Sequence, residues 1–181
     1  MGEPPATTPQ DDFHVDVRLC HPFIEAVSDT LRTLCALNPT VGKPMFRDPG
    51  AKAPRFGVKI LAALSSDTLV AMVTMSFPQD LFLKVVSRIL GAEVRAVTPE
   101  VEEAAKEFSN IVFNRAGRII AGKKMAVIRS IPAIVFGDGL RTAYYASGRT
   151  IVLPLSTEAG NLEIEITGQR LVAQAPILEA A

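Results

Sequence analysis

The sequence predicts an α+β fold in which long helices pack on one face of an antiparallel, or mixed, sheet. Apolar residues recur at helical spacing in three segments, and two adjacent segments alternate with the period of two that is typical of a hairpin. The last third of the chain holds further strand candidates. Because hairpins favour antiparallel pairing, these observations favour the α+β class. A helix followed by antiparallel strands occurs twice, which indicates a pseudo-twofold arrangement.

Length and composition predict one domain. The chain has 181 residues, of which 48% are hydrophobic and 21% charged, so it is long enough to bury a core and too apolar to be disordered throughout. We expect a single domain over residues 13–170, with a flexible N-terminal tail over 1–12 and a flexible C-terminal tail over 171–181.

The charge balance indicates which partners to expect. Lys and Arg number 19, and so do Asp and Glu, so there is no basic excess of the kind that releases counterions from a phosphate backbone. With no Trp and two Tyr, platforms for stacking bases are also scarce. We therefore expect a protein or small-molecule partner and no nucleic acid.

The sequence predicts a cytoplasmic protein with no membrane segment. Its start has no basic region followed by an apolar core, and the most hydrophobic region, 58–77, is interrupted by a polar turn. Cys20 and Cys35 flank one predicted helix, about 22 Å apart, too far for a disulfide. His14 and His21 belong to no zinc-ligand spacing, so we expect no metal site.

The first predicted helix has Pro22 in its first turn, continues with apolar residues at helical spacing, and ends at the Asn-Pro pair 38–39. A weakly alternating segment before it, 13–19, is interpreted as a short strand. A connecting loop over 43–54, rich in proline, is expected to contain at most a short extended piece.

The hairpin follows, with strands over 55–64 and 68–77 joined by a short polar turn. Pro78 then opens a second helix whose apolar stripe stops at Gly91, a residue type that commonly ends helices. The longest helix is predicted to begin with Thr98 as the N-cap and Pro99 at the first position. Acidic residues crowd its front half and basic residues follow, an order that suits the helix dipole.

Four strand candidates come after the long helix, at 132–137, 140–147, 150–155 and 162–167. The last has strict alternation of apolar and polar residues. Gly160-Asn161 marks a hairpin loop between the final two strands.

The candidate functional residues lie on the polar face of the long helix. Glu103, Lys106, Glu107, Asn110 and Asn114 fall at i, i+3, i+4, i+7 and i+11, so they form one stripe opposite the apolar face. Glu107 and Asn110 are neighbours, with Cβ atoms roughly 5–6 Å apart. A carboxylate can pair with a partner's lysine, and a carboxamide can hold a water in line with a phosphorus atom.

The segment 103–112 around this Glu-x-x-Asn motif resembles the signature helix of the CheX-type chemotaxis phosphatases, within the CheC/CheX/FliM superfamily. Shorter segments also resemble segments of that family and occur in the family's order, over roughly residues 15–170. These are Pro22–Val27, Met75–Pro78 with Ile89–Gly91, and Ser130–Pro132 with Val135–Gly137.

The resemblance implies a CheC/CheX-like fold and a hydrolase that acts as a protein aspartyl-phosphate phosphatase. Such proteins bind a phosphorylated CheY-like response regulator, in chemotaxis or another two-component pathway, and speed hydrolysis of its aspartyl phosphate. It assigns Glu107 and Asn110 as catalytic: the carboxylate docks on a lysine of the regulator and the amide orients water. Glu103, Lys106 and Asn114 would be partner-binding residues. The chain would need no cofactor of its own, because the divalent metal, Mg²⁺, belongs to the regulator.

The same resemblance implies a homodimer joined through sheet edges, and it leaves an alternative open. Relatives commonly have Gly where this chain has Lys106 and where it has Phe113, and the bulkier residues favour a non-catalytic scaffold like the FliM middle domain. The first predicted helix offers Glu25-x-x-Ser28 in place of a second Glu-x-x-Asn, so we expect one site. Glu158-x-x-Asn161 repeats the motif in a predicted turn and is assigned no function.

Overall fold

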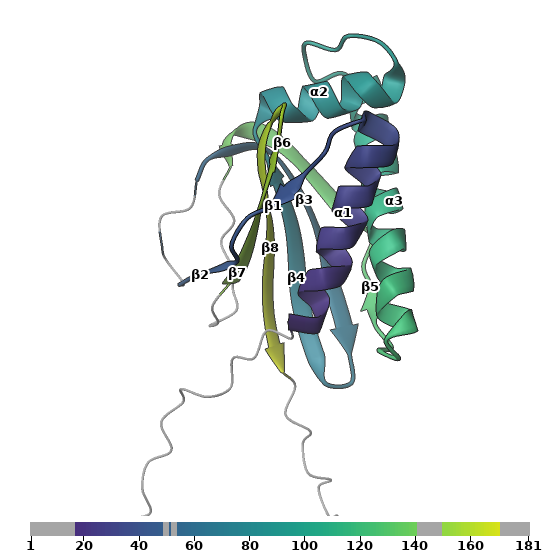
Figure 1. Cartoon of the computed structure of the whole chain (residues 1–181), viewed down its shortest axis with the longest axis vertical. Coiled ribbons are helices and arrows are strands. Elements are labelled where there is room, and N and C mark those ends of the chain that lie inside the picture. Colours follow the sequence, from purple (N-terminus) through teal and green to yellow (C-terminus); the bar gives the residue numbers. More distant parts are fainter. Residues whose placement is uncertain (1–16, 49–50, 52–53, 141–149, 171–181) are drawn as a thin grey trace, which may run out of the picture.

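The computed structural model describes residues 17–48, 51, 54–140 and 150–170. Within them, three α-helices lie on one face of an eight-stranded sheet whose pairings are all antiparallel (Figure 1), which confirms the predicted class. The elements are η1 (Val17–Leu19, a 3-10 turn), α1 (Cys20–Cys35), β1 (Thr40–Val41), β2 (Met45–Arg47), β3 (Phe56–Ser66), β4 (Leu69–Phe77), α2 (Gln79–Leu90), α3 (Pro99–Gly122), β5 (Ile128–Arg129), β6 (Ala133–Leu140), β7 (Thr150–Thr157) and β8 (Gly160–Arg170).

The sheet confirms the pseudo-twofold arrangement. The strand order is β1-β7-β8-β4-β3-β5, with β2 also on β7 and β6 also on β3. Two hairpins, β3–β4 and β7–β8, therefore meet through the antiparallel pair β4–β8 at the centre. The strands that follow α1, β1 and β2, pair with β7 of the second hairpin. The strands that follow α3, β5 and β6, pair with β3 of the first hairpin. Each half of the chain therefore supplies the edge strands of the other half's hairpin.

The helix boundaries follow the predicted signals at α2 and α3. Thr98 caps α3, its Oγ1 accepting a hydrogen bond of 3.4 Å from the Val101 N–H, and Pro99 takes the first helical position. Gly91 ends α2 with a φ of 67°, a left-handed conformation that favours glycine.

The first helix ends at Cys35, before the predicted Asn-Pro pair. Ala36 turns left-handed, with a φ of 47°, and the N–H groups of Ala36 and Leu37 both bond to the Leu31 carbonyl. Arg88 of α2 donates to the carbonyls of Cys35 and Ala36, at 2.6 and 3.0 Å. A contact between two helices thus caps α1 earlier than local sequence alone indicated.

Several strand predictions need correction. The 17–19 part of the expected strand 13–19 is the turn η1, and residues 13–16 lie outside the described residues. Leu140 ends β6, and 141–147 of the expected strand 140–147 also lie outside them. The final hairpin turns at 158–159, and β8 already begins at Gly160. The domain limit at 12–13 lies outside the described residues, and the limit at 170–171 falls where they end, so both limits stay predictions.

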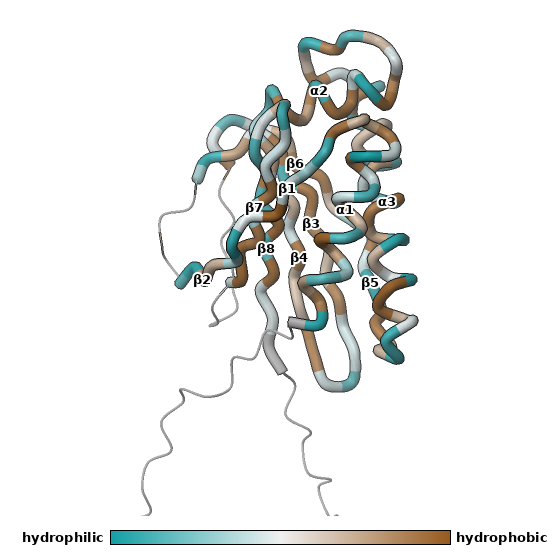
Figure 2. The backbone as a smooth tube through the Cα atoms, in the orientation of Figure 1, coloured by the Kyte–Doolittle hydropathy of each residue, from teal (hydrophilic) through white to brown (hydrophobic). Residues whose placement is uncertain are grey.

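The core lies between the helices and the facing side of the sheet. Apolar residues alternate along β3, β4 and β8 so that one set meets the buried stripes of the helices. In Figure 2 brown segments gather on the central strands, whereas α1 and α3 alternate between brown and teal, as amphipathic helices do. No helix among the described residues is long and apolar enough to cross a membrane.

The opposite side of the sheet carries a buried charged cluster. Lys59 points away from the helices, because the residues on either side of it face the core. Its Nζ lies 2.9 Å from Ser76 Oγ and 3.2 Å from Glu165 Oε2. Arg47 of β2 reaches the same carboxylate with one nitrogen and Glu163, at 2.9 Å, with the other. Side-chain pairing therefore links β2, β3, β4 and β8 across this face.

Candidate functional site

The structure brings the predicted site residues together on one helix surface. Glu103, Lys106, Glu107, Asn110 and Asn114 are all exposed, and all belong to α3. They extend along about three turns of its solvent side, which confirms the predicted stripe.

Aromatic packing fixes which side of α3 faces solvent. Phe108 is fully buried and meets the rings of Phe77 and Phe82 edge-on, with centroids 6.0 and 6.4 Å away. Five residues later Phe113 meets Phe23 of α1 in the same way, at 5.5 Å. Rotating α3 about its axis would break these contacts. The polar stripe is therefore held in place by the core beneath it.

Glu107 and Asn110 project from this helix without partners among the described residues. No hydrogen bond or ion pair within the described part of the chain engages either side chain, although both are polar and exposed. Their i,i+3 spacing places them side by side, one turn apart. The arrangement offers an anionic group and an amide, with donor and acceptor atoms, to whatever approaches α3.

Lys106 is tied to the preceding turn. Its Nζ lies 2.5 Å from Glu103 Oε1, in an i,i+3 pair between exposed side chains. This hydrogen bond and the charge of Glu103 raise the pKa of Lys106 above its usual value. Because Glu103 lies N-terminal to Lys106, the pair draws the ammonium away from Asn110, which lies one turn in the other direction.

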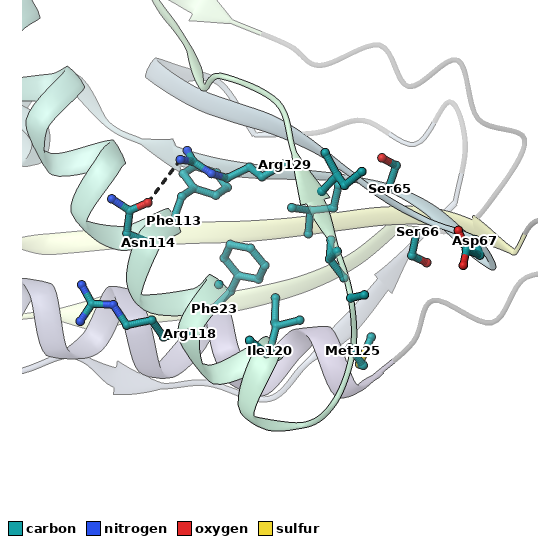
Figure 3. Close-up of a pocket in the computed structure, with 16 residues that line it drawn as sticks. Phe23, Ser65, Ser66, Asp67, Phe113, Asn114, Arg118, Ile120, Met125 and Arg129 are labelled. Carbon is teal, nitrogen blue, oxygen red and sulfur yellow. Dashed lines mark hydrogen bonds between the residues drawn. The ribbon is translucent and has the colours of Figure 1, made fainter.

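Asn114 contacts a segment beyond α3. Its Oδ1 accepts a hydrogen bond of 3.3 Å from Nη2 of Arg129, whose guanidinium also lies over the ring of Phe113 at 5.6 Å (Figure 3). Phe113 is 2% exposed, so it belongs to the core and does not crowd the surface, contrary to the concern raised by the sequence. Arg129 has no recognisable signal in the sequence, because its partner Asn114 lies 15 residues away and the intervening loop carries no periodic pattern.

A cavity opens where the stripe ends. We call it the α3 cavity: it lies between α3 residues 113–121, the segment 125–129 and the hairpin tip 64–67, and its volume is about 700 Å³. Figure 3 shows Asn114 and Arg129 together at one end and Asp67 at the other. The sequence signal that could have pointed to it is Gly117, a glycine inside a helical segment.

The repeated motif at Glu158 and Asn161 has a different setting. Glu158 lies in the turn between β7 and β8, where one carboxylate oxygen accepts a hydrogen bond of 3.4 Å from the Asn38 N–H, and Asn161 lies in β8. No helix presents these two side chains together. As for metals, the described residues include no group of three or more His, Cys, Asp or Glu side chains that could hold an ion.

One family model and several solved structures match this chain. The family model described as chemotaxis phosphatase CheX matches residues 60–156. The structure of CheX from Vibrio vulnificus is 25% identical, with a TM-score of 0.75 over 83% of this chain and 99% of that one. A CheC-like protein from Shewanella sp. PV-4 is 22% identical, with a TM-score of 0.77 over 86% of this chain and 99% of the other.

A third structure is a CheX–CheY complex with BeF3 and Mg²⁺ from Borrelia burgdorferi. It is 21% identical, with a TM-score of 0.66, and the match covers 83% of this chain and 97% of that chain. A sequence comparison with curated proteins found no match.

Proposed function

The chain belongs to the CheX family of chemotaxis phosphatases, and on that premise we propose that it accelerates hydrolysis of the aspartyl phosphate of a CheY-like response regulator through Glu107 and Asn110. The observation that carries the proposal is the exposure of these two side chains, without partners among the described residues, one turn apart on a helix anchored by Phe108. The Borrelia CheX structure, solved with CheY, supports the same class of partner.

Docking is assigned to Glu107. A receiver domain would offer a lysine near its phosphorylated aspartate, and the exposed carboxylate forms a charge-assisted hydrogen bond with it. Glu103 and Lys106, already paired with each other, and Asn114 would contact the rim of the same surface. Because the helix is rigid, seating Glu107 also sets the position of the residue one turn later.

Water positioning is assigned to Asn110. Its amide carbonyl accepts a hydrogen bond from a water, and its NH₂ group donates to a phosphoryl oxygen, so the water oxygen faces phosphorus. The water oxygen bonds to phosphorus as the bond between phosphorus and the aspartyl oxygen breaks, which leaves a free aspartate carboxylate and inorganic phosphate, H₂PO₄⁻, that carries both of the water's protons. No covalent intermediate forms on this chain, and the divalent cation would belong to the regulator.

The alternative is a scaffold that binds regulators without hydrolysis. Two residues favoured it from sequence, and the structure removes the argument from one of them: Phe113 packs in the core against Phe23. Lys106 is held by Glu103, on the side away from Asn110. The surface around the proposed pair is therefore open, as catalysis requires.

The decisive experiment is phosphate release from acetyl-phosphate-labelled receiver domains of the host, each with and without this protein. We expect release from at least one receiver domain to accelerate in proportion to added protein. Binding of a phosphorylated domain with unchanged release would support the scaffold instead.

We also propose a homodimer joined through a sheet edge. Among the described strands, β2 and β6 lie at opposite edges, and each carries an exposed apolar residue: Phe46 in β2, 67% exposed, and Val135 in β6, 41% exposed. Unpaired strand edges with apolar side chains favour pairing with a second copy. Light scattering should give twice the chain mass, and of Phe46→Lys and Val135→Lys only the variant at the pairing edge should halve it. A parent protein with the mass of one chain would contradict the proposal.

A further inference from the structure

The α3 cavity has the size of a binding site. About 700 Å³ falls within the range of pockets that hold small molecules or inserted side chains. Its floor is apolar, built partly from Phe23, Phe113 and Ile120, and its border carries Asn114 and Arg129. An apolar floor with a few polar groups at the border is typical of recognition sites.

A glycine keeps the cavity open. Gly117 is exposed in the interior of α3, where glycine is a poor helix former. Its φ is not positive, and a Cβ built on it would meet no atom within 4 Å beyond its own helix. Neither backbone conformation nor packing within the described structure therefore requires glycine here. The missing side chain leaves space in the cavity, which it helps to line.

Arg129 gives the cavity a positive charge with an unused donor. Nη2 bonds to Asn114, whereas Nη1 is buried and has no hydrogen-bond partner among the described residues. The guanidinium makes no ion pair within the described part of the chain. A carboxylate brought by a partner would supply the missing acceptor after a small shift of the side chain.

The cavity continues the proposed docking surface. Asn114 belongs both to the stripe and to the cavity border, one turn after Asn110, and Gly117 follows about 10 Å along the helix from Asn110. A stable interface buries about 800 Å² on each partner, a patch with a radius of about 16 Å, which two side chains cannot supply. A receiver domain centred on Glu107 and Asn110 must therefore extend over the cavity.

We propose that the α3 cavity receives an apolar side chain, flanked by a carboxylate, from the surface of the docked receiver domain. The inference rests on the proposed function and adds to it a specificity site: the cavity selects among regulators that share the same phosphorylated aspartate. Gly117 admits the apolar group, and Arg129 pairs with the carboxylate beside it.

Gly117→Leu tests this by filling the cavity, and Gly122→Leu is its matched control. Gly122 is also exposed, also in α3 and also free of atoms within 4 Å, but it does not line the cavity. The probe is a phosphorylated receiver domain that the parent protein dephosphorylates. We expect Gly117→Leu to raise KM at least tenfold with kcat within threefold of the parent, and Gly122→Leu to leave both within twofold.

A charge variant tests the second half of the proposal. Arg129→Gln should raise KM at low salt and weaken the dependence of KM on ionic strength, because one charge pair is lost. Equal KM values for Gly117→Leu and Gly122→Leu, with both folded by circular dichroism, would overturn the inference while the phosphatase assignment stands. If the parent accelerates release from no receiver domain, the proposed function fails first, and the inference with it.

Discussion

Lys59 Nζ lies 3.2 Å from Glu165 Oε2, and the two side chains are only 4% and 1% exposed. Removing one partner of a buried pair leaves the other charge uncompensated, so we expect Glu165→Gln to lower the free energy of unfolding by about 3 kcal/mol in urea titrations. The control is Glu93→Gln, which breaks the Arg95 pair at 82% and 71% exposure and should cost less than about 1 kcal/mol. Equal costs would mean that burial does not decide the strength of the Lys59 pair.

Asn110→Ala should lower the catalysed rate of dephosphorylation by about 100-fold or more, while the affinity for the phosphorylated receiver domain changes little. Glu107→Ala should weaken both binding and turnover, because it removes the docking contact. Phosphate release and binding titrations separate the two effects. Asn161→Ala alters the repeated motif outside any helix and should match the parent. Turnover by Asn110→Ala at the parental rate would disprove the assigned roles.

Burial raises the pKa of the Cys35 thiol to about 11, against a smaller lowering by the charge of Arg88. In the unfolded chain this thiol has its ordinary pKa of 9.0, so its contribution to stability is complete below that pH and is lost as pH rises toward 11. Between pH 8 and pH 10 the parent should lose about 1 kcal/mol more unfolding free energy than Cys35→Ala. Urea titrations at both pH values measure the difference, and parallel losses would contradict it.

Gly117→Ala should stabilise the protein by about 0.5–1 kcal/mol, because alanine is the better helix former and its methyl group meets open space. Thermal unfolding would show a higher midpoint. A lower midpoint would reveal a packing requirement at this position and would remove the reason to connect Gly117 with a partner.

Local signals predicted the long helices and the hairpins. The Thr98-Pro99 pair and Gly91 act within a few residues of themselves, so α3 and the end of α2 follow from sequence. The strands β1 and β5 have two residues each and form only because β7 and β3 offer them an edge, which no periodic pattern reveals. The early end of α1 likewise depends on Arg88, 53 residues away from Cys35.

In the candidate site too, some features follow from local sequence and others depend on contacts between distant segments. The polar stripe of α3 could be predicted from residue spacing, because the period of a single helix separates its apolar face from its polar face. Whether Phe113 faces the surface or the core depended on where α1 packs, and only the contact with Phe23 decides it. The pairing of Asn114 with Arg129 depends on the chain's path after α3 and could not be predicted.

The exchange of edge strands between the halves has a consequence for assembly of the chain. Cutting the connection between α2 and α3, at 91–98, would yield two fragments. Each fragment would hold one hairpin, together with the edge strands that pair with the hairpin of the other fragment. Neither fragment could complete its sheet alone, whereas an equimolar mixture could reconstitute the fold. During synthesis β4 of the first hairpin, already paired with β3, must therefore wait for β8, at the end of the described residues, before it has a second neighbour.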